Sequence, residues 1–364
     1  MQGRRLEIIS NKVQRKFIHV DMDSFFVSVE LLGAPHLRFR PVAVGGTIAE
    51  RGVISTSNYV AREFGVRSGM ATATAMRLCP ELVLLPTRFE VYEAVTKLLD
   101  KIFRRYTDKV EFLSLDEASL EVTGQSLFSG SATYMATHIR RAIERELNLT
   151  ASAGVAPLKY LAKIASEVNK PNGMFVVVPE DVKRFLEELD IRKIPGVGPK
   201  TFAVLENLGC RKCKDVTAEK IPALMRYLGV HGFYVWERCQ GIEERDEPIR
   251  DIKSVGVEKT LPFDCEELST CLDELARLSG SLEERISELD AEFFIIKNLV
   301  KLKFSDFSVS CTEAPANIFC RKTVISLCKM LWGTKRNGRA VRLIGLSVKV
   351  KRKTKDDIQM ELSW

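Results

Sequence analysis

A strand-like run that ends in two carboxylates constrains the fold of this chain more than any other feature. Residues 17–20 read Phe-Ile-His-Val, a mostly apolar run of the kind found in strands buried on both faces. Asp21 and Asp23 follow at the carboxyl end of this strand, and either Ser24 or Asp23 offers an N-cap for a helix over residues 25–32. Carboxylates delivered beside a helix start are suited to bind Mg²⁺. The alternative is that Asp23 caps the helix and Asp21 lies in a turn.

A second acidic pair, Asp116 and Glu117, lies between strand-like runs at 110–113 and 118–122. Neighbouring residues of a regular strand point to opposite faces, so both side chains reach one site if a turn or bulge lies at the pair. The flanks are apolar, and burial of carboxylates among them is costly unless a metal, an ion pair or a hydrogen bond compensates. Together with Asp21, these two acids supply what a two-metal phosphoryl-transfer site requires.

Several longer motifs resemble the Y-family DNA polymerases. They are HVDMDSFF from His19, RGVISTSNYVAREFGVRSGM from Arg51, SLDEASLEVT from Ser114, TASAGVAPLKYLAKIASEVNKPNG from Thr150 and KIPGVG from Lys193. The resemblance runs in one order from about Lys16 to the last residue. It implies an α+β, multidomain polymerase right hand, with a ferredoxin-like palm, small fingers, a helical thumb that contains a helix-hairpin-helix, and an α/β little finger.

The domain boundaries follow from this resemblance. We expect a discontinuous palm at residues 1–24 and 88–180, and fingers at 25–87. The thumb follows at 181–243, a linker at 244–253, the little finger at 254–353 and the tail at 354–364. Within the palm, predicted strands and helices alternate as β-α-β-β-α-β, the split arrangement of this domain. In the little finger the pattern predicts strands at 254–260, 299–304 and 341–350, and helices at 268–289 and 321–332.

The resemblance assigns the metal ligands residue by residue. Asp21, Asp116 and Glu117 match the catalytic acids of the family, and the main-chain carbonyl of Met22 matches a further metal ligand. The implied cofactor is a pair of Mg²⁺ ions in each active site, which activates the attacking hydroxyl and stabilises the leaving oxygen.

Four positions match the family's contacts to the incoming nucleotide. Phe26 matches the steric gate, a bulky ring that clashes with a ribose 2′-hydroxyl. Tyr59, Arg62 and Lys170 match residues that contact the triphosphate, for which Arg supplies a fork of donors. Without the resemblance, Phe26 reads equally well as core, Arg62 as part of a solvated helix face and Lys170 as a surface residue in a turn.

Two regions are candidates for DNA contact. Residues 194–198 resemble the hairpin of a helix-hairpin-helix, where Gly196 and Gly198 would let the backbone approach a phosphate, although such glycines also fit any tight turn between helices. Residues 317–355 hold twelve Lys or Arg and no Asp or Glu. A solvated face is the usual explanation of a basic run, but contact with phosphates explains so long a stretch better. The candidate contacts there are Lys335, Arg336, Arg339 and Arg342.

The last six residues resemble the sliding-clamp motif that ends bacterial members of the family. Gln359 would make polar contacts, while Met360, Leu362 and Trp364 would fill apolar pockets of the clamp. The chain terminus is the place where such a motif is expected.

Composition excludes several other classes. The formal net charge of +7 fits an anionic partner without proving one. Nine cysteines include one Cys-x-x-Cys, at Cys210 and Cys213, without a second pair, so free thiols in a reducing cytoplasm explain them better than a zinc or redox site. The sequence shows neither a secretory signal nor a membrane span. The free thiols fit a reducing cytoplasm, and the resemblance implies a bacterial protein that acts as a monomer.

The function implied by the resemblance is template-directed DNA synthesis. The primer 3′-hydroxyl attacks the α-phosphate of a deoxynucleoside triphosphate, and pyrophosphate leaves. No second acidic cluster reads as a 3′–5′ exonuclease, and together with the small fingers this predicts low fidelity and no proofreading. The resemblance further implies translesion synthesis. The expected partners are primer–template DNA, deoxynucleotides and the sliding clamp. A nucleotide cyclase would share the two-metal palm without needing the DNA-binding regions, and a non-catalytic DNA-binding scaffold would not need the three acids.

Overall fold

The computed structural model describes residues 14–242 and 252–353, which form two compact units. The described residues of the first unit lie within Met1–Gly45, Ile54–Met70 and Ala75–Asp246, and those of the second within Gly46–Val53, Ala71–Thr74 and Glu247–Trp364. Most of the expected linker and the clamp-binding tail, with Gln359, Met360, Leu362 and Trp364, lie outside the described residues. Within 14–242 and 252–353, none of the helices combines the length and the hydropathy needed to cross a bilayer.

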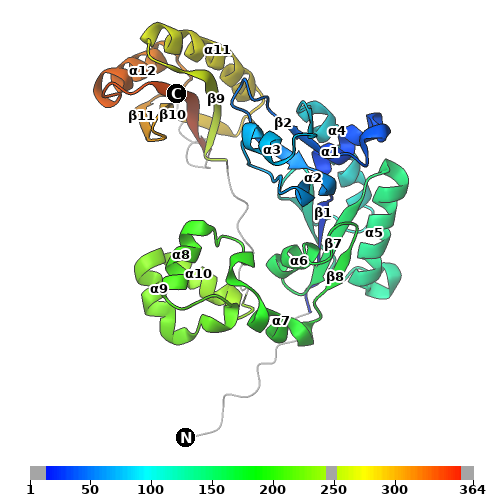
Figure 1. The fold of residues 1–364 in the computed structure, drawn as a ribbon. Coiled ribbons are helices and arrows are strands. Elements are labelled where there is room, and N and C mark those ends of the chain that lie inside the picture. The colour runs from blue at the N-terminus through cyan, green and yellow to red at the C-terminus, as the bar shows by residue number, and fades with distance from the viewer. Residues whose placement is uncertain (1–13, 243–251, 354–364) are drawn as a thin grey trace, which may run out of the picture. The chain divides into compact units, whose positions relative to one another are not determined.

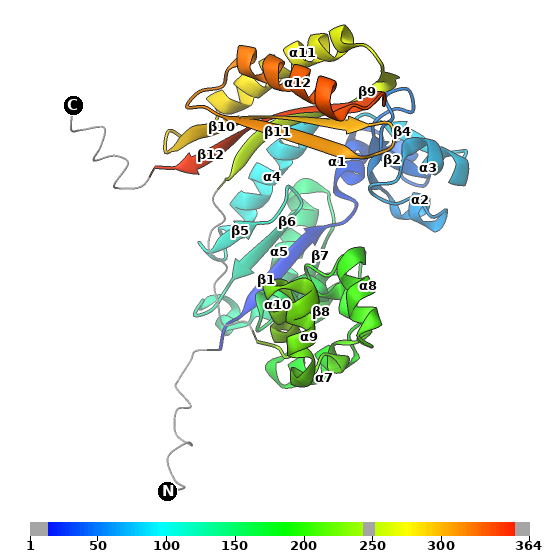
Figure 2. The same cartoon turned by 90° about the vertical axis from the view of Figure 1, so that its left-hand side faces the viewer.

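The first unit is built on a five-stranded sheet with the order β5-β6-β1-β7-β8. Its strands are β1 (Phe17–Met22), β5 (Val110–Phe112), β6 (Glu117–Glu121), β7 (Ala151–Ala156) and β8 (Met174–Val176). The strand β1 pairs antiparallel with both β6 and β7 and so runs through the middle of the sheet, as Figure 2 shows. This is the split arrangement predicted for the palm.

Helices cover the two faces of this sheet in an unequal way. The helices α4 (Phe89–Phe103) and α5 (Ala132–Leu147) share a core with Ile18, Val20 and Met22 of β1. On the other face lies α6 (Lys159–Ser166), whose core includes Phe17. Because side chains alternate along a strand, His19 and Asp21 point to the face that α6 covers. The candidate site therefore lies between the sheet and α6.

A smaller three-stranded sheet, with the order β3-β2-β4, carries the predicted fingers elements. Its strands are β2 (Val42–Gly45), β3 (Ile54–Ser57) and β4 (Val83–Leu85), and its helices are α1 (Phe25–Gly33), α2 (Tyr59–Glu63) and α3 (Thr72–Leu78). Asn58 caps α2, since its side chain accepts a hydrogen bond from the Ala61 N–H at 2.9 Å. The cap fixes where α2 begins and thereby places Tyr59 and Arg62.

The predicted thumb consists of short helices that pack on α6. They are α7 (Val182–Glu188), α8 (Pro199–Asn207), α9 (Ile221–Leu228) and α10 (Val230–Cys239). Ile194 and Val197 of the hairpin share one apolar core with Leu161 and Ile164 of α6, so the hairpin sits beside the palm. Gly196 has a φ of +92°, and a Cβ there would lie 2.8 Å from a carbon of the His231 ring. Both facts favour glycine at this turn.

The second unit contains a four-stranded antiparallel sheet, in the order β11-β10-β12-β9, under two helices. Figure 2 shows α11 (Leu268–Ser287) and α12 (Arg321–Lys335) on one face of it. The strands β9 (Ser254–Cys265), β10 (Phe293–Phe304) and β12 (Val341–Arg352) are longer than predicted, and β11 (Val309–Pro315) was missed. As a half-exposed edge strand, β11 needs little hydrophobic patterning, which explains the omission. All nine cysteines are free thiols, as expected.

Candidate active site

The two acidic elements meet where β1 ends and β6 begins. Asp21 lies directly opposite Glu117 in the antiparallel pairing of the two strands. The N–H of Met22 donates a hydrogen bond to the carbonyl of Asp116 at 2.9 Å, which joins the two elements. Asp116 lies in the bend just before β6, so a turn does occur at the acidic pair, as the sequence required.

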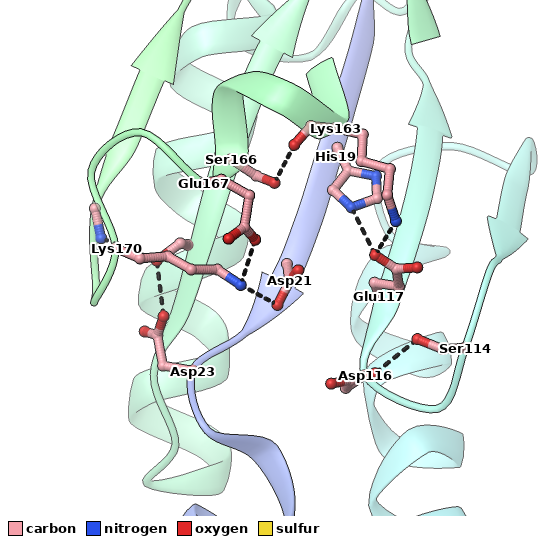
Figure 3. A network of polar contacts seen from close by, with 12 residues as sticks. His19, Asp21, Asp23, Ser114, Asp116, Glu117, Lys163, Ser166, Glu167 and Lys170 are labelled. Atoms are coloured by element: carbon pink, nitrogen blue, oxygen red, sulfur yellow. Dashed lines mark hydrogen bonds and ion pairs between the residues drawn. The ribbon is translucent and has the colours of Figure 1, made fainter. Parts of the chain in front are cut away.

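A buried histidine joins this group of acids. Single ligand atoms of His19, Asp21 and Glu117 lie within 4.8 Å of one another, and the His19 ring is fully buried. Nε2 of His19 lies 3.3 Å from Oε2 of Glu117, close enough for an ion pair when the imidazole is protonated. Asp116 instead accepts a hydrogen bond from the Ser114 hydroxyl at 2.6 Å, as Figure 3 shows. Sequence reasoning missed His19, although its position two residues before Asp21 on the same strand face was a usable signal.

Two lysines lie against the paired carboxylates. Nζ of Lys170 lies 2.5 Å from Oδ1 of Asp21 and 2.7 Å from Oε1 of Glu167, and Lys163 forms an ion pair with Glu117 (Figure 3). Lys170 was expected at the site, whereas Lys163 and Glu167 were not. The ammonium groups bring to the carboxylates the positive charge that divalent cations would supply.

The pKa values of the two opposed carboxylates move in opposite directions. Burial raises the pKa of Asp21 to about 7, although the neighbouring Lys170 acts against this shift. The His19 ring and the Lys163 ammonium lower the pKa of Glu117 to about 2. Burial also lowers the pKa of His19, which favours its neutral, ligand-competent form. A pair of half-buried carboxylates beside a neutral imidazole is a donor set that fits a divalent cation.

Asp23 has a structural role that differs from the predicted one. Its carboxylate accepts hydrogen bonds from the Ser152 hydroxyl and the Asn172 N–H, both at 2.8 Å. The expected N-cap of α1 is therefore wrong for Asp23, and Ser24 makes no side-chain capping bond either. Asp23 instead fastens the loop that follows Lys170, because Asn172 lies two residues beyond that lysine.

Two of the residues expected to contact the nucleotide differ in their surroundings: the Tyr59 hydroxyl has no partner, whereas the Phe26 ring is stacked on another ring. The hydroxyl of Tyr59 is buried without a hydrogen-bond partner, and the guanidinium of Arg62 lies 4.6 Å from the centre of the Tyr59 ring. Phe26 stacks on Tyr92, with ring centroids 4.1 Å apart, and the Tyr92 hydroxyl donates to Glu30 at 2.8 Å. The orphaned Tyr59 hydroxyl fits a site that is completed by a polar ligand.

Profiles of one family match the chain in order. The impB/mucB/samB family matches residues 20–167, the IMS family HHH motif residues 179–209, and the impB/mucB/samB C-terminal domain residues 252–361. A protein of Pectobacterium atrosepticum named DNA polymerase IV is 49% identical over 335 residues, which cover 92% of this chain and 95% of that protein. The chain belongs to the impB/mucB/samB family, the Y family of DNA polymerases. Its activity is that of a DNA-directed DNA polymerase in translesion synthesis.

Further relatives of this Y-family polymerase agree. A DNA polymerase IV of Citrobacter koseri is 48% identical over 337 residues, covering 92% of this chain and 95% of its own. A solved Y-family DNA polymerase chimera superposes with a TM-score of 0.83 at 28% identity, covering 92% of this chain and 98% of its own. The insertion ternary complex of Dbh DNA polymerase gives a TM-score of 0.64 at 28% identity. The match covers 93% of this chain and 100% of the Dbh chain. Membership in the family implies dependence on a divalent metal.

The hairpin of the predicted thumb borders a cleft of about 550 Å³. The cleft is lined by Lys163, Ile164 and Glu167 and by residues 192–198. The hairpin carbonyls are held from α10, where Arg238 donates to the carbonyl of Pro195 at 2.7 Å and His231 lies 3.0 Å from that of Gly196. These contacts leave the glycine-rich turn, with Gly198 as the N-cap of α8, beside a basic cleft.

Three of the expected little-finger contacts, Arg336, Arg339 and Arg342, already have partners within their own unit. Arg336 lies over Trp332, while Arg339 lies over Phe304 and binds Asp306 at 3.1 Å. Acids from other parts of the unit also pair with members of the basic run, as Glu283 does with Arg321, Glu292 with Arg352 and Glu313 with Lys349. The fold therefore neutralises part of the charge that the sequence concentrates there, and DNA contact by Lys335, Arg336, Arg339 and Arg342 stays a prediction.

Proposed function

We propose that Asp21, Asp116 and Glu117, with the main-chain carbonyl of Met22, hold two Mg²⁺ ions for nucleotidyl transfer. The observation that carries this assignment is the pairing of Asp21 with Glu117 across β1 and β6, at the buried end of the sheet. The ions supply charge that activates the primer 3′-hydroxyl and stabilises the leaving pyrophosphate. His19 and Lys163 keep Glu117 ionised, while Lys170 provides a countercharge to Asp21.

The incoming deoxynucleotide is held on the side of Asp21 where Lys170 lies. Lys170, Tyr59 and Arg62 supply an ammonium, a hydroxyl and a guanidinium to the triphosphate. The unpartnered Tyr59 hydroxyl supports this assignment, because a buried hydroxyl without a partner is costly until a ligand satisfies it. Phe26, held by its stacking on Tyr92, serves as the steric gate under the sugar.

The remaining partners are primer–template DNA and the sliding clamp. Gly196 and Gly198 offer backbone groups to phosphates, Lys335, Arg336, Arg339 and Arg342 add charge in the little finger, and Gln359, Met360, Leu362 and Trp364 form the clamp-binding tail. The chain acts as a monomer in the cytoplasm of a bacterium, with low fidelity and without proofreading. The family membership and the basic cleft beside the hairpin support DNA as the substrate.

Primer extension tests this proposal directly. The protein and its Asp116→Ala variant are compared on a primed template with Mg²⁺ and each deoxynucleotide in turn. We expect template-dependent extension with frequent misinsertion and intact primers, and its loss in the variant. Extension that survives the substitution would remove Asp116 from the metal site. Degradation of the primer by the intact protein would contradict the absence of proofreading.

A further inference from the structure

Lys163 is paired with Glu117, a carboxylate that the proposed active site uses as a metal ligand. Its ammonium forms an ion pair with Glu117, and its backbone lies in the last turn of α6, which packs over β1 and β6. The assignment of Glu117 as a metal ligand belongs to the proposed function, and the present inference rests on it. A divalent ion on that carboxylate would both neutralise it and repel the ammonium. Lys163 must then find another partner.

The position of Lys163 limits what that partner can be. The side chain is 37% exposed, and it lines the cleft that the hairpin 194–198 closes from the other side. The cleft also receives Lys193 and Arg192, of which Arg192 is paired with Asp190, and its acid, Glu167, is paired with Lys170. A freed ammonium at this wall faces a basic, half-open space that suits an anion. The proposed function brings the primer 3′-hydroxyl to the catalytic acids, so the phosphates next to that hydroxyl are anions available to this wall.

We propose that Lys163 is a metal-gated contact for the primer. Without a divalent ion, Lys163 binds Glu117 and the primer lacks one charged partner. With the ion in place, the ammonium leaves Glu117 and binds a phosphate near the primer 3′ end, on the wall of the cleft. Metal binding and primer binding thereby strengthen each other, and linkage makes the two effects equal. The triphosphate is bound separately, because Lys170 serves Asp21 and Glu167.

A matched control lies one helical turn away. Lys159 is also a lysine of α6 paired with a glutamate of the β5–β6 hairpin, at 2.6 Å from Glu111. Glu111 is exposed and takes no part in the group of ligand atoms at Asp21. Lys159→Gln therefore removes the same charge from the same helix without touching a metal ligand.

The experiment measures primer–template affinity by fluorescence anisotropy without nucleotide, in EDTA and in saturating Mg²⁺ at one ionic strength. In the unchanged protein we expect Mg²⁺ to tighten binding by about 10-fold, the size of one charge-assisted contact. Lys163→Gln should lose this gain, Lys163→Arg should keep most of it, and Lys159→Gln should keep all of it. Melting temperatures establish that each variant is folded.

Two further measurements locate the contact. Neutral methylphosphonate linkages, placed one at a time along the primer 3′ end, should abolish the gain at one position and have no further effect in Lys163→Gln. Without DNA, Lys163→Gln should bind Mn²⁺ more tightly by electron paramagnetic resonance titration, because no ammonium competes for Glu117. Binding of a deoxynucleotide without primer should be unchanged.

The outcomes separate this inference from the proposed function. If Glu117→Gln loses the Mg²⁺ gain but Lys163→Gln keeps it, the metal assignment stands and the role of Lys163 is wrong. If Glu117→Gln keeps the gain and binds Mn²⁺ as tightly as the unchanged protein does, the metal assignment at Glu117 fails and the inference fails with it. If the unchanged protein shows no gain while Glu117→Gln weakens Mn²⁺ binding, the metal assignment stands and the inference alone is overturned. A gain that Lys159→Gln loses as well would reduce the effect to general electrostatics and would also overturn the inference.

Discussion

The palm and the little finger both bring lysines against carboxylates on a sheet, and the two pairings behave in opposite ways. In the palm, Asp21 touches Lys170, yet burial raises its pKa to about 7. In the little finger, Glu313 touches Lys297 and Lys349, and these lysines lower its pKa. The chemistry of the partners is the same in both places. Between Asp21 and Glu313 the difference is burial, which decides whether desolvation or attraction determines the sign of the pKa shift. Glu117, also in the palm, keeps a low pKa because its contacts with His19 and Lys163 outweigh its desolvation.

The two sheets reach this difference through their helices. The little-finger helices cover one face, and Lys301 and Glu258 pair at 2.7 Å on the other, where water screens them. In the palm both faces are covered, so His19 and Asp21 lie under α6 in a medium that penalises charge. The half-buried acids under α6 are those of the proposed metal site, whereas the exposed pairs on the open face of the little finger stay in contact with water.

The largest effect should come from removing one opposed carboxylate charge in the palm. Glu117→Gln keeps the shape of the side chain but removes its charge, and we expect nucleotide incorporation to fall by about 10³-fold or more, as for loss of a major electrostatic group. The matched control is Glu111→Gln on the same hairpin, which should stay near the unchanged rate. Single-turnover incorporation measures both. A rate for Glu117→Gln within tenfold of the unchanged protein would place the metal site elsewhere.

Phe26→Ala tests whether the ring of Phe26 makes the enzyme select deoxyribonucleotides over ribonucleotides. Removal of the ring opens space for a 2′-hydroxyl, so discrimination against ribonucleotides should fall by about 10²-fold, the scale on which a pocket rejects one added hydroxyl. The ratio of kcat/KM for a deoxynucleotide and its ribonucleotide measures this. Phe89→Ala removes a neighbouring ring that contacts Phe26 edge-on at 5.9 Å and should leave most of the discrimination. Equal effects of the two variants would contradict the gate assignment.

Asp23→Ala should destabilise the protein even though Asp23 lies two residues from Asp21. The substitution leaves the Ser152 hydroxyl and the Asn172 N–H without their acceptor in a buried place, at a cost of about 2–4 kcal/mol. The loop after Lys170 loosens, so KM for the deoxynucleotide should rise more than kcat falls. Denaturant unfolding and steady-state kinetics measure the two effects. Asp23→Asn keeps one acceptor oxygen and should recover part of the stability.

Those features of this site that depend on local patterns could be predicted from the sequence. Periodicity placed β1 and the hairpin, and the turn at Asp116 followed from the need to bring two neighbouring acids together. The role of Asp23 was misjudged because a carboxylate before a helix looks like an N-cap, whereas its partners are 129 and 149 residues away in the chain. Lys163 was missed because its importance depends on how α6 lies over the sheet, which no local pattern encodes. His19 could have been found from its place two residues before Asp21 on the same strand face.

Asp21→Asn should stabilise the metal-free protein, with a dependence on pH that the unfolded and folded pKa values define. The pKa of this carboxyl rises from 3.8 to about 7 on folding, so between these pH values the carboxyl is ionised in the unfolded chain but still protonated in the folded one. The carboxyl therefore leaves the free energy of unfolding unchanged below pH 3.8, and lowers it progressively as the pH rises to about 7. The variant should gain about 2–4 kcal/mol at pH 8 and almost nothing near pH 4. Denaturant unfolding in EDTA at several pH values measures this. Saturating Mg²⁺ should shrink the gain, since the ion stabilises the ionised carboxylate of the unchanged protein.

The smallest effect should come from the open face of the little finger, and it completes the comparison. Lys301→Gln breaks the exposed pair with Glu258, so the free energy of unfolding should change by less than about 0.5 kcal/mol. Lys335→Gln should lower DNA affinity about equally for different sequences and reduce the slope of log affinity against log salt by about one. A loss of stability from Lys301→Gln as large as that from Asp23→Ala would mean that exposure does not decide the energetics. Burial would then no longer explain the different behaviour of the charged pairs on the two sheets.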